Sequence, residues 1–290
     1  MKVLSFKIPK PENQLVRHQV DDVPYFYDKL HQHPEVQLTK ILHGVGNLVV
    51  GDYIGRFAAG DMYILGQDIP HVFRNDDSYY LGDKSKRAYM ESLFYDLKVV
   101  GNHLVHIEEF SGIMEFFKKL DGCYKVHDQS NYIKKRIIKL RTITGLNRII
   151  LSMEVLHRLM QEGTLQRLNK MGSVRNYSKK EGRRMDNVMR FLMEESHRQV
   201  KLAEVAEVAN MNKEAFCRFF KERTRKTLTE FHNEVRITNA CHMLGNKDMS
   251  ISQVANESGF SNLSYFNRVF RKLNGVTPKE FRKSLQKGTE

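Results

Sequence analysis

The N-terminal third of the chain shows the hydrophobic pattern of short strands. From about Leu30 to Glu109, short apolar stretches alternate with turn signals rich in glycine, asparagine and aspartate. Val36–Leu42 and Gly46–Val50 are two such stretches, and a last pair of strands is expected around 88–108. Short strands at close, regular spacing are typical of antiparallel sandwiches and barrels. The sequence therefore predicts an antiparallel β-barrel over residues 1–111.

After this region the apolar residues recur with helical period. Helices are expected throughout residues 112–163, the last of them over Leu146–Gln161, and together they form a helical connector. Residues 164–183 are weakly patterned and rich in Lys, Arg, Asn, Gly and Ser, which favours a linker. Residues 184–290 are almost wholly helical in pattern, with no proline before Pro278. The predicted fold class is thus multidomain β plus α: an N-terminal antiparallel barrel, a helical connector and a C-terminal all-α domain.

The C-terminal domain contains an internal repeat. Three residues of its first copy recur 50 residues later in the second: Phe216, Arg218 and Phe220 correspond to Phe266, Arg268 and Phe270. Each copy predicts a helix–turn–helix unit, with helices over 201–209 and 213–223 in the first and over 250–258 and 263–273 in the second. Gly259 suits the left-handed end of a helix, and either Ser261 or Asn262 can cap the helix that follows.

The charge distribution points to a polyanionic partner for the C-terminal part. Of the net charge of +13, residues 1–111 contribute −3, residues 112–183 contribute +10 and residues 184–290 contribute +6. A major groove admits one helix, and an arginine fork matches guanine. Between the two copies lies Leu228–Leu244, which as a helix spans roughly 26 Å. It can therefore hold two recognition helices about one DNA turn apart on one face.

Three motifs of the second copy carry a family resemblance. They are Ile251-Ser-Gln-Val-Ala-Asn-Glu-Ser-Gly-Phe260, Tyr265-Phe-Asn-Arg-Val-Phe-Arg-Lys272 and Gly275-Val-Thr-Pro-Lys-Glu-Phe-Arg282. With them, residues 184–286 resemble the DNA-binding domain of AraC/XylS-type bacterial transcription regulators. The resemblance implies base contacts from both second helices, at Glu214, Cys217, Arg218, Leu263, Ser264, Asn267 and Arg268. It also implies a dimerisation face within residues 112–163.

Basic residues lie on the outward faces of the same helices. Arg218, Lys221, Arg268, Arg271 and Lys272 fall there, opposite the Phe stripes. Arg268 is near the N-terminal end of its helix, the end that enters the groove, and is predicted to contact a base. Lys221 lies farther along the first recognition helix and is predicted to contact a phosphate.

Two segments of the N-terminal region resemble the sequence motifs of cupin barrels, which are effector domains in many AraC-like proteins. They are His31-Gln32-His33-Pro34-Glu35 and Gly60…Pro70-His71…Asn75. A cupin metal site would use His31, His33, a glutamate and His71, but Glu35 comes earlier than the usual carboxylate. Strand alternation instead places His33, Glu35 and Gln37 on one face. We therefore expect His31, His33, Glu35, Gln37 and His71 to line a polar effector pocket, without metal or cofactor; a purely structural role is the remaining alternative.

Several protein classes are disfavoured. No run approaches the 18 or so apolar residues of a membrane span, and the N-terminal residues lack the apolar core of a secretory signal. Cys123, Cys217 and Cys241 are widely spaced and form no CxxC pair, which argues against disulfide frameworks and zinc fingers. A cytoplasmic protein is expected.

The leading interpretation is a sequence-specific transcription regulator and not an enzyme. It would bind double-stranded promoter DNA as a homodimer, under the control of a small polar effector for which a sugar is a candidate. An activator is favoured over a repressor, and RNA polymerase is then a further partner. The alternatives are a metal-dependent cupin dioxygenase or isomerase fused to a DNA-binding domain, and a non-specific architectural DNA binder.

Overall fold

The computed structural model describes residues 14–83, 85–104, 106–161, 163–170 and 179–287. The chain divides into two compact units, residues 1–53 with 57–180 and residues 54–56 with 181–290. They are described one at a time, and residues 54–56 are described with the strand that contains them. Within the described ranges, no helix combines the length and the apolarity needed to cross a bilayer.

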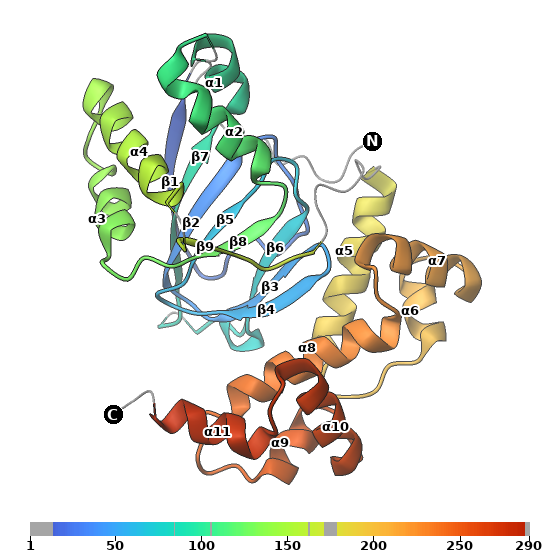
Figure 1. The fold of residues 1–290 in the computed structure, drawn as a ribbon. Helices are drawn as coiled ribbons and strands as arrows, with labels where there is room; N and C mark the ends of the chain where they lie inside the picture. The colour runs from blue at the N-terminus through green and yellow to red at the C-terminus, as the bar shows by residue number, and fades with distance from the viewer. Residues whose placement is uncertain (1–13, 84, 105, 162, 171–178, 288–290) are drawn as a thin grey trace. The chain divides into compact units, whose positions relative to one another are not determined.

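The strands of the N-terminal unit form two sheets rather than one closed barrel (Figure 1). The larger sheet has the order β1-β7-β2-β5-β8-β9 and its pairings are antiparallel. It consists of β1 (Val16–Val23), β2 (Val36–His43), β5 (Met62–Leu65), β7 (Ala88–Tyr95), β8 (Cys123–Val126) and β9 (Leu165–Arg167). The smaller sheet has the order β4-β3-β6 and consists of β3 (Gly46–Val50), β4 (Tyr53–Phe57) and β6 (His71–Asn75).

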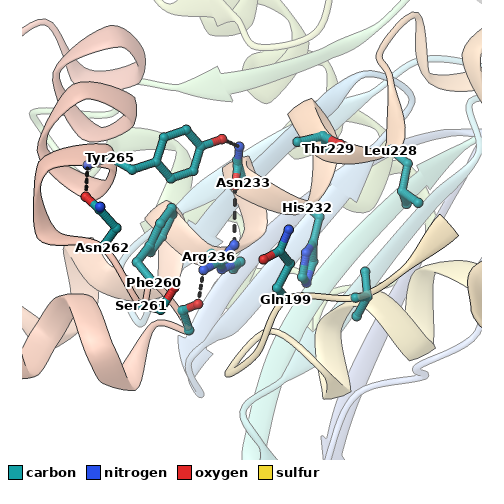
Figure 2. A pocket seen from close by; sticks show the side chains of 12 residues that line it. Gln199, Leu228, Thr229, His232, Asn233, Arg236, Phe260, Ser261, Asn262 and Tyr265 are labelled. Atoms are coloured by element: carbon teal, nitrogen blue, oxygen red, sulfur yellow. Dashed lines mark hydrogen bonds between the residues drawn. The ribbon is translucent and has the colours of Figure 1, made fainter.

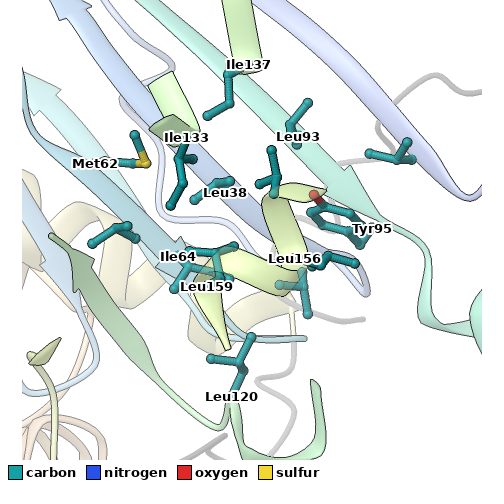
Figure 3. Close-up of a cluster of buried hydrophobic side chains, with 14 of the residues drawn as sticks. Leu38, Met62, Ile64, Leu93, Tyr95, Leu120, Ile133, Ile137, Leu156 and Leu159 are labelled. Atoms are coloured by element: carbon teal, nitrogen blue, oxygen red, sulfur yellow. The ribbon is translucent and has the colours of Figure 1, made fainter. Parts of the chain in front are cut away.

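Helices cover one face of the larger sheet. They are α1 (Leu97–Leu104), α2 (Ser111–Lys119), α3 (Tyr132–Lys139) and α4 (Gly145–Leu159). Figure 3 shows how strand residues such as Leu38 and Leu93 meet helical residues such as Ile133 and Leu156 in one buried cluster. Burial of this cluster holds the connector helices on the sheet.

The opposite face of the larger sheet packs toward the smaller sheet. Ile41 of β2 and Met90 of β7 share a second buried cluster with Leu48 of β3, Phe57 of β4 and Phe73 of β6. Because successive side chains of a strand point to opposite faces, β2 and β7 are buried on both sides. Gln37, Thr39 and Ser92 therefore lie on the face toward the smaller sheet, away from the helices.

The structure corrects several expectations for this unit. The pattern predicted a strand pair around 88–108, but only β7 forms and α1 follows it. Strand β1, which was not predicted, pairs with β7 along its whole length. The predicted connector contains β8, and the predicted linker contains β9, which pairs with β8. Strands of three or four residues are shorter than the window in which periodicity is recognised.

The C-terminal unit is wholly helical and contains the two predicted helix–turn–helix copies. Its helices are α5 (Lys179–Glu194), α6 (Leu202–Val208), α7 (Lys213–Thr224), α8 (Leu228–Met243), α9 (Ile251–Glu257), α10 (Leu263–Asn274) and α11 (Pro278–Lys287). Asn212 Oδ1 accepts a hydrogen bond from the Ala215 amide at 2.8 Å, and Asn262 Oδ1 accepts one from the Tyr265 amide at 2.9 Å. Asn262, rather than Ser261, therefore caps α10.

Aromatic packing repeats in the two copies. Phe216 lies 5.4 Å from Phe220, measured between ring centroids, and Phe266 lies 5.6 Å from Phe270. Each second ring then meets an aromatic residue of the next helix: Phe220 meets Phe231 at 5.3 Å, and Phe270 meets Phe281 at 5.6 Å. Burial of these rings leaves the opposite faces of α7 and α10 exposed.

We predict that Gly259→Ala destabilises the C-terminal unit far more than Gly275→Ala. Both glycines have φ near the left-handed region, at +78° and +76°, where an L-residue loses about 1–2 kcal/mol. A Cβ on Gly259 would lie 2.6 Å from the His197 carbonyl carbon, whereas nothing lies within 4 Å of one on Gly275. Urea unfolding of the full chain, followed by circular dichroism, measures both losses. Equal losses would show that backbone conformation alone matters at Gly259.

Candidate effector cavity and nucleic-acid interface

A cavity of about 420 Å³ lies in the N-terminal unit. Its walls come from β1, the segment before β2, and strands β2, β6 and β7, and its polar lining includes Asp21, Asp28, His31, His33, Gln37 and His71. Four of the five predicted effector residues thus line one cavity. Glu35 is buried but does not line it.

Three histidines form the floor of this cavity. Reciprocal backbone hydrogen bonds of 3.1 and 2.9 Å join His31 and His71. The ring of His71 lies 4.4 Å from that of His31 and 5.1 Å from that of His33, between centroids. His71 is the first residue of β6 and pairs with His31 in the segment before β2. The fold thereby brings two residues 40 positions apart into contact.

Each imidazole is oriented by a backbone carbonyl two residues away. The Nδ1 atoms lie 2.8 Å from Lys29 O for His31, 3.0 Å from Glu35 O for His33 and 2.7 Å from Ile69 O for His71. A neutral imidazole that donates from Nδ1 keeps a lone pair on Nε2. Nε2 of His71 has no hydrogen-bond partner among the described residues, so this lone pair is free to accept from a ligand.

A chain of hydrogen bonds connects His33 to β7. His33 Nε2 lies 3.0 Å from Gln37 Oε1, and a neutral His33 can donate its single N–H either to this oxygen or to Glu35 O. The Gln37 amide nitrogen donates to Thr39 Oγ1 at 2.7 Å. Thr39 in turn shares a short hydrogen bond with Ser92. Of the predicted polar row, His33 and Gln37 line the cavity and Glu35 does not. The Glu35 carboxylate lies 3.7 Å from His33 Nδ1. Thr39, which was not predicted, continues the row along β2.

Burial keeps these histidines neutral. It lowers the pKa of His31 to about 4 and also lowers the pKa of His33. The pKa of His71 falls well below its usual range, because burial and the two neighbouring imidazoles disfavour its charged form. Neutral imidazoles can accept hydrogen bonds from a polar ligand at physiological pH.

The same three histidines are the donor types that a transition metal prefers. Their candidate ligand nitrogens all lie within 4.8 Å of one another, which is the arrangement of a group that could hold a metal ion. Three histidines are enough for a zinc site that keeps an open position. Glu35, the nearest carboxylate in sequence, does not line the cavity.

The predicted DNA-contacting residues lie on α7 and α10, and all of them are exposed. They are Glu214, Cys217, Arg218 and Lys221 on α7, and Leu263, Ser264, Asn267, Arg268 and Arg271 on α10. The guanidinium of Arg268 lies 5.2 Å from the centroid of the Tyr265 ring, which helps to orient it.

A hollow of about 630 Å³ beside α10 adds basic residues that the pattern analysis missed. Arg225 and Lys226, from the turn between α7 and α8, line it together with Arg268 and Lys272. The only signal for the first two was the basic run Arg223–Lys226 directly after a recognition helix. Glu230 and Glu234 also line the hollow, and Lys226 Nζ pairs with Glu234. Of the two, Arg225 therefore extends the basic surface around α10.

Comparison with known proteins agrees with this helical architecture. A protein-family model described as a helix-turn-helix domain matches residues 205–284. The Msm operon regulatory protein of Streptococcus mutans is 22% identical over 251 residues, which cover 85% of this chain and 83% of that protein. The transcriptional activator RhaS of Salmonella schwarzengrund is 26% identical over 176 residues, which cover 56% of this chain and 59% of that protein.

Among solved structures, the DNA-binding domain of AdpA in complex with a target DNA is 26% identical. It covers 33% of this chain and 87% of that domain, with a TM-score of 0.32. The C-terminal unit thus contains a helix-turn-helix domain, and the chain is similar to proteins that are named as operon regulators and transcriptional activators. These homologues point away from an enzyme.

We predict that acid destabilises the N-terminal unit through the buried histidines. In the unfolded chain His31 titrates near 6.5, but in the folded protein its pKa is about 4. Between these values the unfolded chain binds a proton that the folded chain excludes, so the free energy of unfolding falls as pH is lowered through this window. Urea unfolding of His31→Gln should show a weaker pH dependence than the wild type. The exposed His127→Gln serves as control, and an unchanged slope in His31→Gln would contradict the prediction.

Proposed function

We propose that this protein is a sequence-specific transcription regulator whose binding to promoter DNA is controlled by a small polar effector. The observation that carries the proposal is the duplicated helix–turn–helix unit, whose two second helices expose basic residues opposite buried phenylalanine pairs. Promoter DNA as partner implies action in the cytoplasm. The name of the relative RhaS, a transcriptional activator, supports activation over repression.

Two residues of equal charge have different proposed roles. Arg268 is the sixth residue of α10 and lies over Tyr265, where its planar fork can match guanine O6 and N7. Lys221 lies in the last turn of α7 and contacts a phosphate.

Arg268→Ala should therefore reduce affinity for the operator by ~1–3 kcal/mol, with a smaller loss on scrambled DNA. Lys221→Ala should weaken binding to both duplexes alike. It should also reduce the salt slope, which is the dependence of log affinity on log salt concentration, by about 1. Titrations of both variants on operator and scrambled duplexes, at two salt concentrations, decide between the roles. Equal losses on both duplexes for Arg268→Ala would identify it as a phosphate contact.

The effector in this proposal is a small polar molecule, with a sugar as the best candidate. The three imidazoles and the amide of Gln37 supply hydrogen-bond donors and acceptors to the cavity. Asp21 and Asp28 supply carboxylates. Tyr25 and Tyr27 also line it and are partly exposed, so a sugar face can stack on them. Hydroxyl groups both donate and accept, which matches this mixed lining.

His71→Ala should abolish the stabilisation that the effector confers, while DNA affinity without effector changes little. The reason is that His71 Nε2 is the unpartnered acceptor of the cavity floor. Melting shifts of the full chain across a panel of sugars and polar metabolites identify the ligand, and the same ligand is then tested on His71→Ala. The exposed His127→Ala is the control. A normal response in His71→Ala would place the effector elsewhere.

We further propose a homodimer that forms through α3 and α4. Leu146 is 71% exposed and Ile150 is 49% exposed, and Ile138 and Ile149 are also exposed large apolar residues on these two helices. A second copy that covers this face removes their apolar surface from water.

Ile150→Glu should shift the full chain from dimer to monomer, because it places a charge in the centre of the apolar face. Sedimentation velocity at tens of micromolar measures the change. Lys118→Glu, an exposed position on α2 outside this face, controls for charge alone. A wild-type protein that sediments as a monomer would refute the dimer.

A further inference from the structure

A second cavity, of about 280 Å³, lies within the C-terminal unit between α8, the segment before α6 and the turn before α10 (Figure 2). Gln199 and Val200 line it from the segment before α6, and α8 contributes residues from its N-terminal half. The turn before α10 and the start of that helix close the other side, from Gly259 to Tyr265. None of the described lining residues is Asp or Glu.

Arg236 of α8 brings a buried positive charge to this cavity. It is only 5% exposed, and its guanidinium lies 3.7 Å from the centroid of the Phe260 ring. Nε donates to Ser258 O at 2.9 Å, Nη1 donates to Asn233 Oδ1 at 3.4 Å, and Nη2 donates to Gly259 O.

These acceptors are all neutral, and no carboxylate pairs with Arg236 in the described part of the chain. Burial lowers the pKa of Arg236 to about 10, which still leaves it charged at neutral pH. A guanidinium has five N–H donors, so these contacts leave donors available on both terminal nitrogens. A buried charge without a counter-ion is costly, and an anion in the cavity would offset that cost.

His232, one turn before Arg236, is a second polar group without a full set of partners. It is 4% exposed, and its Nε2 atom has no hydrogen-bond partner among the described residues. The other ring nitrogen is occupied by the backbone of Glu195. Burial and the nearby arginines lower the pKa of His232 to about 4, so Nε2 is an acceptor at neutral pH. This acceptor suits a ligand that also carries a hydroxyl or other donor.

The backbone around the cavity is also electropositive. Helix α8 begins at Leu228 and α10 begins at Leu263, and the first residues of both or their caps line the cavity. Helix N-termini carry partial positive charge and favour anions. Leu228, Val200 and Phe260 supply apolar surface beside this polar side.

We propose that this cavity binds a small organic anion, a carboxylate or a phosphate monoester. The anionic group lies against Arg236, and the remainder packs on the apolar side. With roughly 30 Å³ for each water-sized group, the cavity holds on the order of nine non-hydrogen atoms. A free anion fits better than a phosphate of the DNA backbone, because Arg236 and His232 are recessed and a polymer phosphate carries its sugars with it.

The position of the cavity gives such an anion a consequence for DNA binding. It would connect α8, which joins the two copies, with the turn that sets the start of α10. Occupancy would therefore restrict how the second recognition helix is oriented relative to the first. This second ligand site is separate from the effector cavity and does not depend on the effector proposal.

The test uses the full chain and two probe anions, butyrate and inorganic phosphate, at constant ionic strength with chloride as reference. We expect at least one of them to give saturable binding by calorimetry and a rise in melting temperature. Butyramide, the uncharged analogue of butyrate, should give neither. Arg236→Lys keeps the charge but loses the fork and should weaken anion affinity on the order of tenfold, as expected for loss of a hydrogen bond to a charged group. His232→Phe fills part of the cavity and should weaken it as well.

Arg282→Lys is the matched control, because Arg282 Nε also donates to a carbonyl near a helix end, Leu244 O at 3.2 Å, but does not line the cavity. It should bind the anion as the wild type does. The proposal fails if neither probe binds saturably, if butyramide acts like butyrate, or if His232→Phe binds normally. It also fails if no free anion binds while Arg236→Lys lowers the salt slope of DNA binding, since the cavity would then take a backbone phosphate.

Discussion

Burial of β2 and β7 on both faces is the constraint on which the N-terminal unit depends. The face of these strands that meets the helices presents apolar residues such as Leu38 and Leu93. Their opposite face packs against the smaller sheet. A shift of register by one residue would exchange these faces. The polar residues that do point inward satisfy one another, from Gln37 through Thr39 to Ser92, which removes the penalty of burying them alone.

In the C-terminal unit, burial likewise fixes which residues face outward, but the buried residues recur with the period of a helix instead of that of a strand. Burial of Phe266 and Phe270 sets the rotation of α10 about its axis, so the same packing decides that Asn267 and Arg268 face outward. The Asn262 cap sets where that helix begins. Because the periodic signal is strong and occurs twice, the sequence alone predicted the four helices of the two copies and the helix between them to within two residues at each end.

Other features could not be predicted because they depend on contacts between distant segments. Strands β8 and β9 are too short to show alternation, and they exist because β5 offers a free edge to β8. Glu35 shares the strand parity of His33 and Gln37, but it precedes the first residue of β2, so alternation does not govern it. Arg236 looks like an ordinary polar residue of a helix, and only the approach of the turn after α9 buries it.

The pairing of β8 with β9 holds the two ends of the segment between them side by side. Tyr124, Lys125 and Val126 pair with Arg167, Gln166 and Leu165, so α3 and α4 leave the sheet and return to it at neighbouring points. A segment whose two ends lie side by side can be exchanged or lengthened without reordering the strands around it. The helical layer can therefore diverge between relatives while the cavity on the other face of the sheet is retained. Conversely, a chimera that keeps the cavity lined by His31, His33 and His71 must include residues through β9, because a cut at residue 111 would remove the β8–β9 edge of its sheet.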